Sequence, residues 1–214
     1  MASQWRYILS IDLTDEEKNL IEKRRIRWTG QETLQLFAYG SLMWRPGFSF
    51  QGALPAKIMG YHRSFCVVST YYRGSADWPG LVLGLDRGGA CTGVLYTIDK
   101  TDGSRVLDYL HEREMVTGIY EPRWVKAVTK DKKVISALAY VVDRTHHQYT
   151  GKLAPEEVAR RIGRAVGIGG SNKDYLMNTL CHLRELNIRD PRLERLAELL
   201  HHTLAHDKTS QADS

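Results

Sequence analysis

The sequence predicts an α+β protein, in which a small mixed β-barrel has flanking and C-terminal helices. Between Gln35 and Val142 the chain alternates short apolar runs with turn residues, which indicates about six strands. That many short strands in about a hundred residues favour a barrel or a strongly curled sheet. A helical pattern over residues 103–114 interrupts the strands, and the chain becomes helical after residue 150.

Length and composition suit one domain, or one domain with an appendage. The chain has 214 residues, of which 43% are hydrophobic, so it can bury a sizeable core. We expect an accessory segment at 1–33, one domain at 34–206 and a disordered polar tail at 207–214. No apolar run reaches the roughly 18 residues that span a membrane, and the first residues lack the pattern of a secretory signal. We therefore expect no membrane association; the sequence specifies no oligomeric state.

Strands are predicted where apolar residues alternate between turn signals. Leu34, Leu36 and Ala38 alternate with their neighbours in a way that suits a strand packed on both faces. The turn at 86–89 is expected to end one strand, and Gly93 marks a bulge or a close approach of backbones. Further strands are expected at 56–61, 62–70, 81–85, 91–98, 121–129 and 134–142, with a hairpin turn at 131–133.

Capping residues mark the helices. Thr14 and Glu17 have the spacing of a capping box at the start of an N-terminal helix. Pro155 suits the first position of a helix, and Pro191 opens the last one. Ser171 follows a glycine-rich break and can cap the helix between them.

Cysteines and histidines suggest neither disulfides nor a metal site. Cys66, Cys91 and Cys181 lie far apart and include no CxxC pair, so a reducing cytoplasm is the simplest compartment. Cys66 lies in a predicted strand and is better interpreted as a small core residue than as a nucleophile. Two pairs of histidines are adjacent in sequence, at 146–147 and 201–202. Adjacent side chains would point apart on any regular element, so neither pair suggests a metal site.

The segment from Tyr39 to Leu42 is the first candidate for a binding site. It follows the first strand, and Gly40 permits a backbone conformation that residues with a side chain resist. Successive N–H groups in such a turn can point into one concavity and hold an anion, with the Ser41 hydroxyl at its rim. The alternative is an ordinary strand-to-loop junction.

Glu114 is the second candidate, because it lies on the apolar side of the 103–114 helix. Val106, Leu107 and Leu110 form the apolar stripe, and a step of four from Leu110 reaches Glu114. Glu112 lies roughly 200° around the helix from it, on the solvent side. A buried carboxylate needs a partner or a function. Glu114 is therefore either a general base with an adjusted pKa or the partner of an arginine, unless the helix ends early and exposes it.

Five ordered motifs, which extend over about residues 35–200, resemble the ChaC family of glutathione-specific γ-glutamylcyclotransferases. They are YGSLMW at 39–44, GYHRSF at 60–65, PGLVLGL at 79–85, RE at 113–114 with the residues after it, and GGSNKDYL at 169–176. The resemblance implies a γ-glutamylcyclotransferase-like fold. It also implies an enzyme that splits glutathione into 5-oxoproline and cysteinylglycine, with no cofactor and no metal.

The same resemblance implies roles for individual residues. The backbone amides of Tyr39, Gly40, Ser41 and Leu42 would bind the γ-glutamyl group, and Glu114 would be the catalytic acid and base.

Three further residues are candidates for substrate contact on chemical grounds. Arg63 and Arg73 can meet the carboxylates of the tripeptide, since a guanidinium matches carboxylate geometry, although each could equally be structural. Tyr140 ends an apolar strand and can donate its hydroxyl into the pocket, although it could equally be a core tyrosine.

Two other functions remain open from the sequence. The same fold could act on other γ-glutamyl amides, or the chain could be a non-catalytic binding module. A net charge of +5, with a basic cluster at 23–25, is compatible with nucleic acid, with an anionic small molecule or with neither. The intact Tyr39–Leu42 turn together with Glu114 argues against a binding module, and we expect no nucleic-acid partner.

Overall fold

A computed structural model of the protein describes residues 13–212, and side chains as far as His202. The described residues form two compact units, one made of residues 13–62 and 85–147 and the other of residues 63–84 and 148–212. The boundaries predicted for a single domain stay a prediction. Within the described part, no helix has the length and apolar character needed to cross a membrane.

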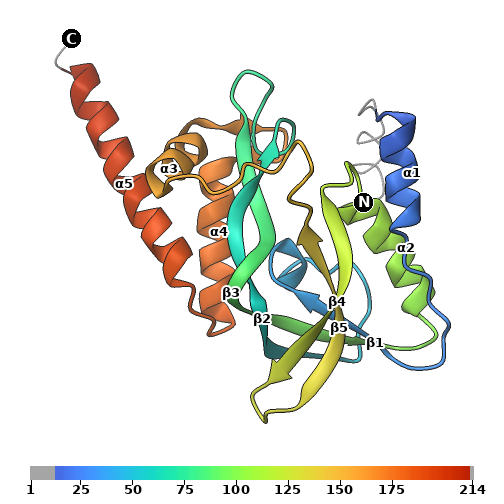
Figure 1. Ribbon diagram of the computed structural model, residues 1–214. Helices are drawn as coiled ribbons and strands as arrows, with labels where there is room; N and C mark the ends of the chain where they lie inside the picture. Colours follow the sequence, from blue (N-terminus) through green and yellow to red (C-terminus); the bar gives the residue numbers. More distant parts are fainter. Residues whose placement is uncertain (1–12, 213–214) are drawn as a thin grey trace. The chain divides into compact units, whose positions relative to one another are not determined.

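Five strands close into a barrel in the order β1-β3-β2-β4-β5 (Figure 1). Strand β1 pairs antiparallel with β3 along its whole length and parallel with β5 at Leu36 and Leu138. The parallel pair completes the barrel and makes its strands mixed in direction, as the sequence predicted. The strands are β1 (Leu34–Ala38), β2 (Gly52–Ser69), β3 (Gly80–Ile98), β4 (Tyr120–Thr129) and β5 (Val134–Val142).

Strands β2 and β3 are longer than predicted. The expected breaks at residues 61–62 and 86–89 are wrong, because the chain bends at glycines there and continues as a strand. Gly60, Gly88 and Gly89 have φ values of 84°, 98° and 73°, a region that side chains disfavour. A glycine in this conformation can bend a strand without ending its pairing.

The residues of β1 that the alternation identified are part of the core. Leu34, Leu36 and Ala38 are completely buried, as are Ala137 and Leu138 of β5. Gly93 of β3 lets the backbone of that strand approach Ala38 closely at the end of β1.

Two helices belong to the first unit and lie beside one another (Figure 1). Helix α1 (Asp15–Lys23) begins with the predicted capping box, in which Thr14 and Glu17 bond each other's backbone. Helix α2 (Gly103–Glu114) has the predicted bounds and buries Val106, Leu107 and Leu110.

Charged groups attach α1, since none of its residues is buried. Arg24, just after the helix, donates to the Gly118 carbonyl at 2.7 Å, to Glu121 at 3.0 Å and to Asp143 at 2.5 Å. Arg25 pairs with Asp108 of α2 at 3.0 Å. Two of the three basic residues at 23–25 therefore bind carboxylates of the chain itself.

The second unit contains three helices that pack against one another, and its capping residues lie where the sequence placed them. Helix α5 continues to Ala212, although a disordered tail was predicted from residue 207, because no glycine or proline after Pro191 interrupts it. Residues 213–214 of that tail lie outside the described residues. The elements are α3 (Pro155–Arg164), the hairpin of β6 (Val166–Gly167) and β7 (Gly170–Ser171), α4 (Asn172–Glu185) and α5 (Pro191–Ala212).

The close approach predicted at Gly93 yields a test of the barrel. A Cβ atom at Gly93 would overlap the carbonyl oxygen of Ala38 and lie 2.8 Å from Phe37 Cζ. We expect Gly93→Ala to lower the free energy of unfolding by roughly 1–3 kcal/mol, the usual cost of overpacking. Urea denaturation measures this change.

Gly52→Ala is the matched control, since its new Cβ would meet its nearest neighbour, Thr97, at an ordinary 3.9 Å. Equal stability of the two variants would show that the strands do not need the close approach at Gly93.

Candidate active site

The predicted binding turn follows β1 directly and forms a short 3₁₀ helix, η2 (Ser41–Met43). The first hydrogen bond inside it runs from Met43 N to the Gly40 carbonyl at 2.9 Å, and Arg45 N bonds the Ser41 carbonyl. The N–H groups of Ser41 and Leu42 come before Met43 N, the first donor of these bonds, because they lie at the start of the turn. Gly40 has a φ of −127°, so the turn does not use the left-handed conformation.

A buried tyrosine of the barrel holds the turn through hydrogen bonds. The hydroxyl of Tyr96, in β3, bonds the carbonyl oxygens of Leu42 at 3.2 Å and Met43 at 2.9 Å. Phe48 and Phe50 pack against the same ring with centroid distances of 5.6 Å and 4.8 Å. The turn is therefore held in one position before any ligand binds.

Arg113, at the end of α2, connects this turn to Glu114. Its guanidinium donates to Ser41 Oγ at 2.9 Å, to the Arg45 carbonyl at 2.6 Å and to the Tyr109 hydroxyl at 2.8 Å. Its Nε lies 3.2 Å from Glu114 Oε1. One side chain thus fixes the position of the turn relative to the carboxylate.

Glu114 is placed as its position on the helix predicted. Its side chain is only 17% exposed, whereas Glu112 is an exposed residue. The structural alternative, an arginine partner, is also present, because Arg113 contacts it. Burial nevertheless raises the pKa of Glu114 above its ordinary value, and the charge of Arg113 opposes this only in part. The carboxyl can therefore both lose and regain a proton, as a catalytic acid and base must.

Tyr140 belongs to the same end of the barrel. The parallel pair of Leu36 and Leu138 brings Tyr140, two residues further along β5, level with Ala38, where the turn begins. Burial raises the pKa of Tyr140 far above the usual value, and the nearby Glu114 carboxylate raises it further. Tyr39 and Tyr140 are both buried, with 8% and 4% of their surface exposed.

Arg63 and Arg73 belong to the second unit, where both have protein partners. Arg63 is buried and pairs with Asp190 at 2.6 Å. Arg73 bonds the Gly169 carbonyl and lies over the Tyr175 ring, 5.0 Å from its centroid. These contacts suit structural roles, and substrate contact by either arginine stays a prediction. Cys66 is buried, as expected of a core residue.

Sequence reasoning missed two residues of the site, Arg113 and Tyr96. Arg113 directly precedes Glu114 in the sequence, and residues adjacent on a helix do not normally face each other. A polar residue in the apolar run of β3 was the available signal for Tyr96, because a buried hydroxyl requires a hydrogen-bond partner.

Comparison with known proteins places these features in a family. The sequence model of the family described as ChaC-like protein matches residues 34–203. The glutathione-specific gamma-glutamylcyclotransferase of Escherichia coli (strain K12) is 35% identical over 161 residues, which cover 75% of this chain and 70% of that protein. Glutathione-specific gamma-glutamylcyclotransferase 1 of Homo sapiens is 35% identical over 150 residues, which cover 68% of each chain.

The fold has solved counterparts. A crystal structure of a yeast gamma-glutamyl cyclotransferase specific to glutathione matches with a TM-score of 0.72, over 80% of this chain and 97% of that chain. Its sequence is 21% identical, so this likeness supports the fold alone. The predicted α+β fold and the family resemblance are confirmed, and the chain belongs to the ChaC family.

Proposed function

We propose that this protein is a γ-glutamylcyclotransferase, a carbon–nitrogen lyase that converts glutathione into 5-oxoproline and cysteinylglycine. The names of its relatives support the substrate. The observation that carries the chemistry is the Glu114 carboxyl, which is buried, has a raised pKa and is joined through Arg113 to the Ser41 turn.

The reaction needs no nucleophile from the protein. The α-amine of the γ-glutamyl residue attacks the γ-carbonyl carbon, and a five-membered lactam forms as the bond to the cysteinyl nitrogen breaks. Because the attack is intramolecular, the enzyme mainly has to hold a folded conformer of the substrate, and such reactions reach effective molarities of ~10⁵ M or more. The turn at Tyr39, Gly40, Ser41 and Leu42 would hold the γ-glutamyl end through its N–H groups.

Glu114 would balance the protons of this reaction. The substrate amine arrives as an ammonium and must lose a proton before it attacks, while the departing nitrogen must gain one. A single carboxyl can accept the first proton and donate the second. The raised pKa of Glu114 supports this role, since it makes the protonated form accessible closer to neutral pH than in an ordinary glutamate.

Three further side chains are candidates for contact with the substrate. The charge of Glu114 contributes to the raised pKa of Tyr140, so the two side chains are near each other. Tyr140 is therefore our candidate for a hydroxyl donor to the reacting end of the substrate. Arg63 and Arg73 stay candidates for the carboxylates of the tripeptide.

We place the protein in the cytoplasm, where glutathione keeps thiols reduced. Its three cysteines form no disulfide, which fits that compartment. Nucleic acid is not among the proposed partners, because Arg24 and Arg25 of the basic cluster pair with carboxylates.

We expect Glu114→Gln to lower 5-oxoproline release from reduced glutathione by about 10²-fold or more, because it removes the general acid and base. Release can be followed by chromatography with purified protein and no added metal. Glu112→Gln is the matched control, since Glu112 lies two positions away on the exposed face of the same helix.

A Glu114→Gln variant as active as the Glu112→Gln variant would remove Glu114 from the mechanism. γ-Glutamylalanine should be tested beside glutathione. A protein that cleaves only γ-glutamylalanine would keep the chemistry and contradict the substrate.

The pH dependence of the same reaction tests the influence of Arg113. Because Glu114 must be ionised to accept the first proton, kcat/KM should fall on the acidic side as the pH approaches its pKa. Arg113 lowers that pKa. We therefore expect Arg113→Met to move the acidic limb to higher pH.

Ionisations of glutathione itself are common to both proteins and cancel in this comparison. Arg105→Met, an exposed arginine of the same helix, should leave the limb in place. A limb that stays in place or moves to lower pH in Arg113→Met would contradict the electrostatic role of Arg113.

A further inference from the structure

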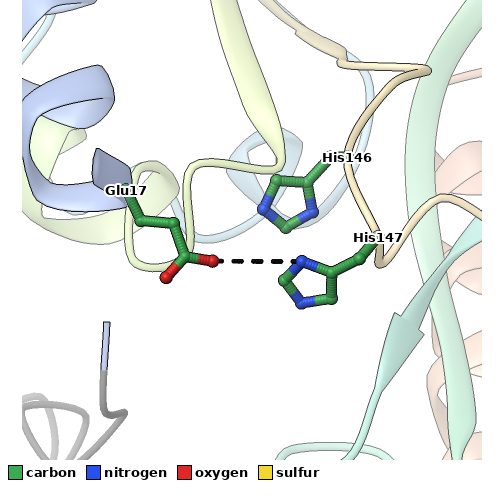
Figure 2. A group of neighbouring side chains, drawn as sticks. All are labelled: Glu17, His146 and His147. Carbon is green, nitrogen blue, oxygen red and sulfur yellow. Dashed lines mark ion pairs between the residues drawn. The ribbon is translucent and has the colours of Figure 1, made fainter. Parts of the chain in front are cut away.

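Three side chains outside the proposed active site converge in the first unit. They are Glu17 of α1 and the adjacent residues His146 and His147, which follow β5 (Figure 2). The sequence predicted that adjacent histidines point apart, but that holds only on a regular element. Here they lie in a turn and their rings stack, with centroids 4.3 Å apart and an angle of 29° between the planes.

The capping box orients the carboxylate of Glu17. Its Oε2 accepts hydrogen bonds from the Thr14 backbone at 2.8 Å and from the Thr14 hydroxyl at 3.0 Å. Its Oε1 faces the imidazole of His147, with 3.9 Å between Oε1 and Nδ1. One oxygen therefore stabilises the helix start while the other is directed at the histidines.

A backbone carbonyl orients the imidazole of His146. The Nε2 of His146 lies 2.9 Å from the Thr117 carbonyl oxygen, which can only accept a hydrogen bond, so Nε2 carries the proton. This tautomer has its lone pair on Nδ1, the nitrogen that would bind a metal. Histidine ligands of metal ions usually donate their other N–H to a carbonyl or carboxylate in this way, which fixes the ring and the tautomer.

We propose that Glu17, His146 and His147 form a binding site for one Zn²⁺ ion. One ligand atom from each residue lies within 4.8 Å of the others. Ligands about 2.0–2.1 Å from a tetrahedral zinc are about 3.3 Å apart, so the three side chains must move closer together when the ion binds. The His147 side chain, 71% exposed, has room to make that movement.

The chemistry of the three donors favours this ion. Two imidazoles and one carboxylate are a known ligand set for zinc, with a water molecule as the fourth ligand. Magnesium and calcium prefer sites made of oxygen atoms.

The ion would connect elements of the first unit and would take no part in the proposed reaction. It joins α1 to the turn after β5 and, through His146, to Thr117 in the segment that follows Glu114. Arg24 already connects α1 with Asp143 of the same turn. A bound ion would add a second attachment for a helix that buries no residue of its own.

Isothermal titration calorimetry of Zn²⁺ into the full-length chain, without a histidine tag, tests the proposal. We expect one ion per chain, and binding weakened about tenfold or more by His147→Ala or by Glu17→Gln. Glutamine can replace glutamate in a capping box, so Glu17→Gln spares the helix start. Zn²⁺ should also raise the melting temperature of the wild-type protein more than that of His147→Ala.

The double variant His201→Ala/His202→Ala is the control, because it removes an adjacent pair of exposed histidines elsewhere in the chain. It should bind Zn²⁺ like the wild-type protein. The proposal is wrong if the wild-type protein binds no Zn²⁺, if Glu17→Gln and His147→Ala bind as tightly as it does, or if the control variant loses the site.

Discussion

The contact of Arg113 with both Ser41 and Glu114 is the interaction on which the arrangement of the proposed active site depends. The guanidinium has five donors in a rigid plane, and here they reach a hydroxyl, a backbone carbonyl, a phenol and a carboxylate. A lysine could not replace this geometry, since it offers a single point charge on a flexible chain. Arg113 therefore fixes the distance between the turn and the carboxylate.

The same contact sets the acidity of Glu114. Burial raises the pKa of this carboxyl, whereas the positive charge of Arg113 lowers it. The two influences oppose each other in Glu114, and burial prevails, so its pKa lies above the ordinary value. A carboxyl with a raised pKa is better suited than an ordinary glutamate to return a proton to the departing nitrogen of the substrate.

The barrel supplies the frame for these groups. The parallel pairing of β1 with β5 brings the turn and Tyr140 to one end of the barrel, and the antiparallel pairing with β3 supplies Tyr96. The close approach of Gly93 to Ala38 lets β3 support the last residue before the turn. Helix α2 then delivers Arg113 and Glu114 from its last turn.

Local signals predicted much of this structure. The bounds of α2, the capping box at Thr14 and the cap at Ser171 follow from neighbouring residues, and the structure has all three. Glu114 could be distinguished from Glu112 because helical periodicity is local. The continuity of β2 and β3 could not be predicted, because a glycine bends or ends a strand according to partners that are distant in sequence.

The contact of Arg113 with Ser41 could not be predicted from local patterns either, since Ser41 lies 72 residues away. The convergence of Glu17 with His146 and His147 depends on how α1 attaches to the turn after β5, which no periodicity describes. The residues that local patterns identified are therefore those of single elements, and the residues that they missed are those that connect elements.

The most direct test of the proposed chemistry is the pKa of Glu114 itself, measured by NMR on protein labelled with ¹³C in the glutamate carboxyl groups. Glu114→Gln assigns the resonance by its disappearance. We predict a titration midpoint above the ordinary value of 4.5. A midpoint at or below that value would show that the pair with Arg113 prevails over burial, and would contradict the role of Glu114 as an acid and base.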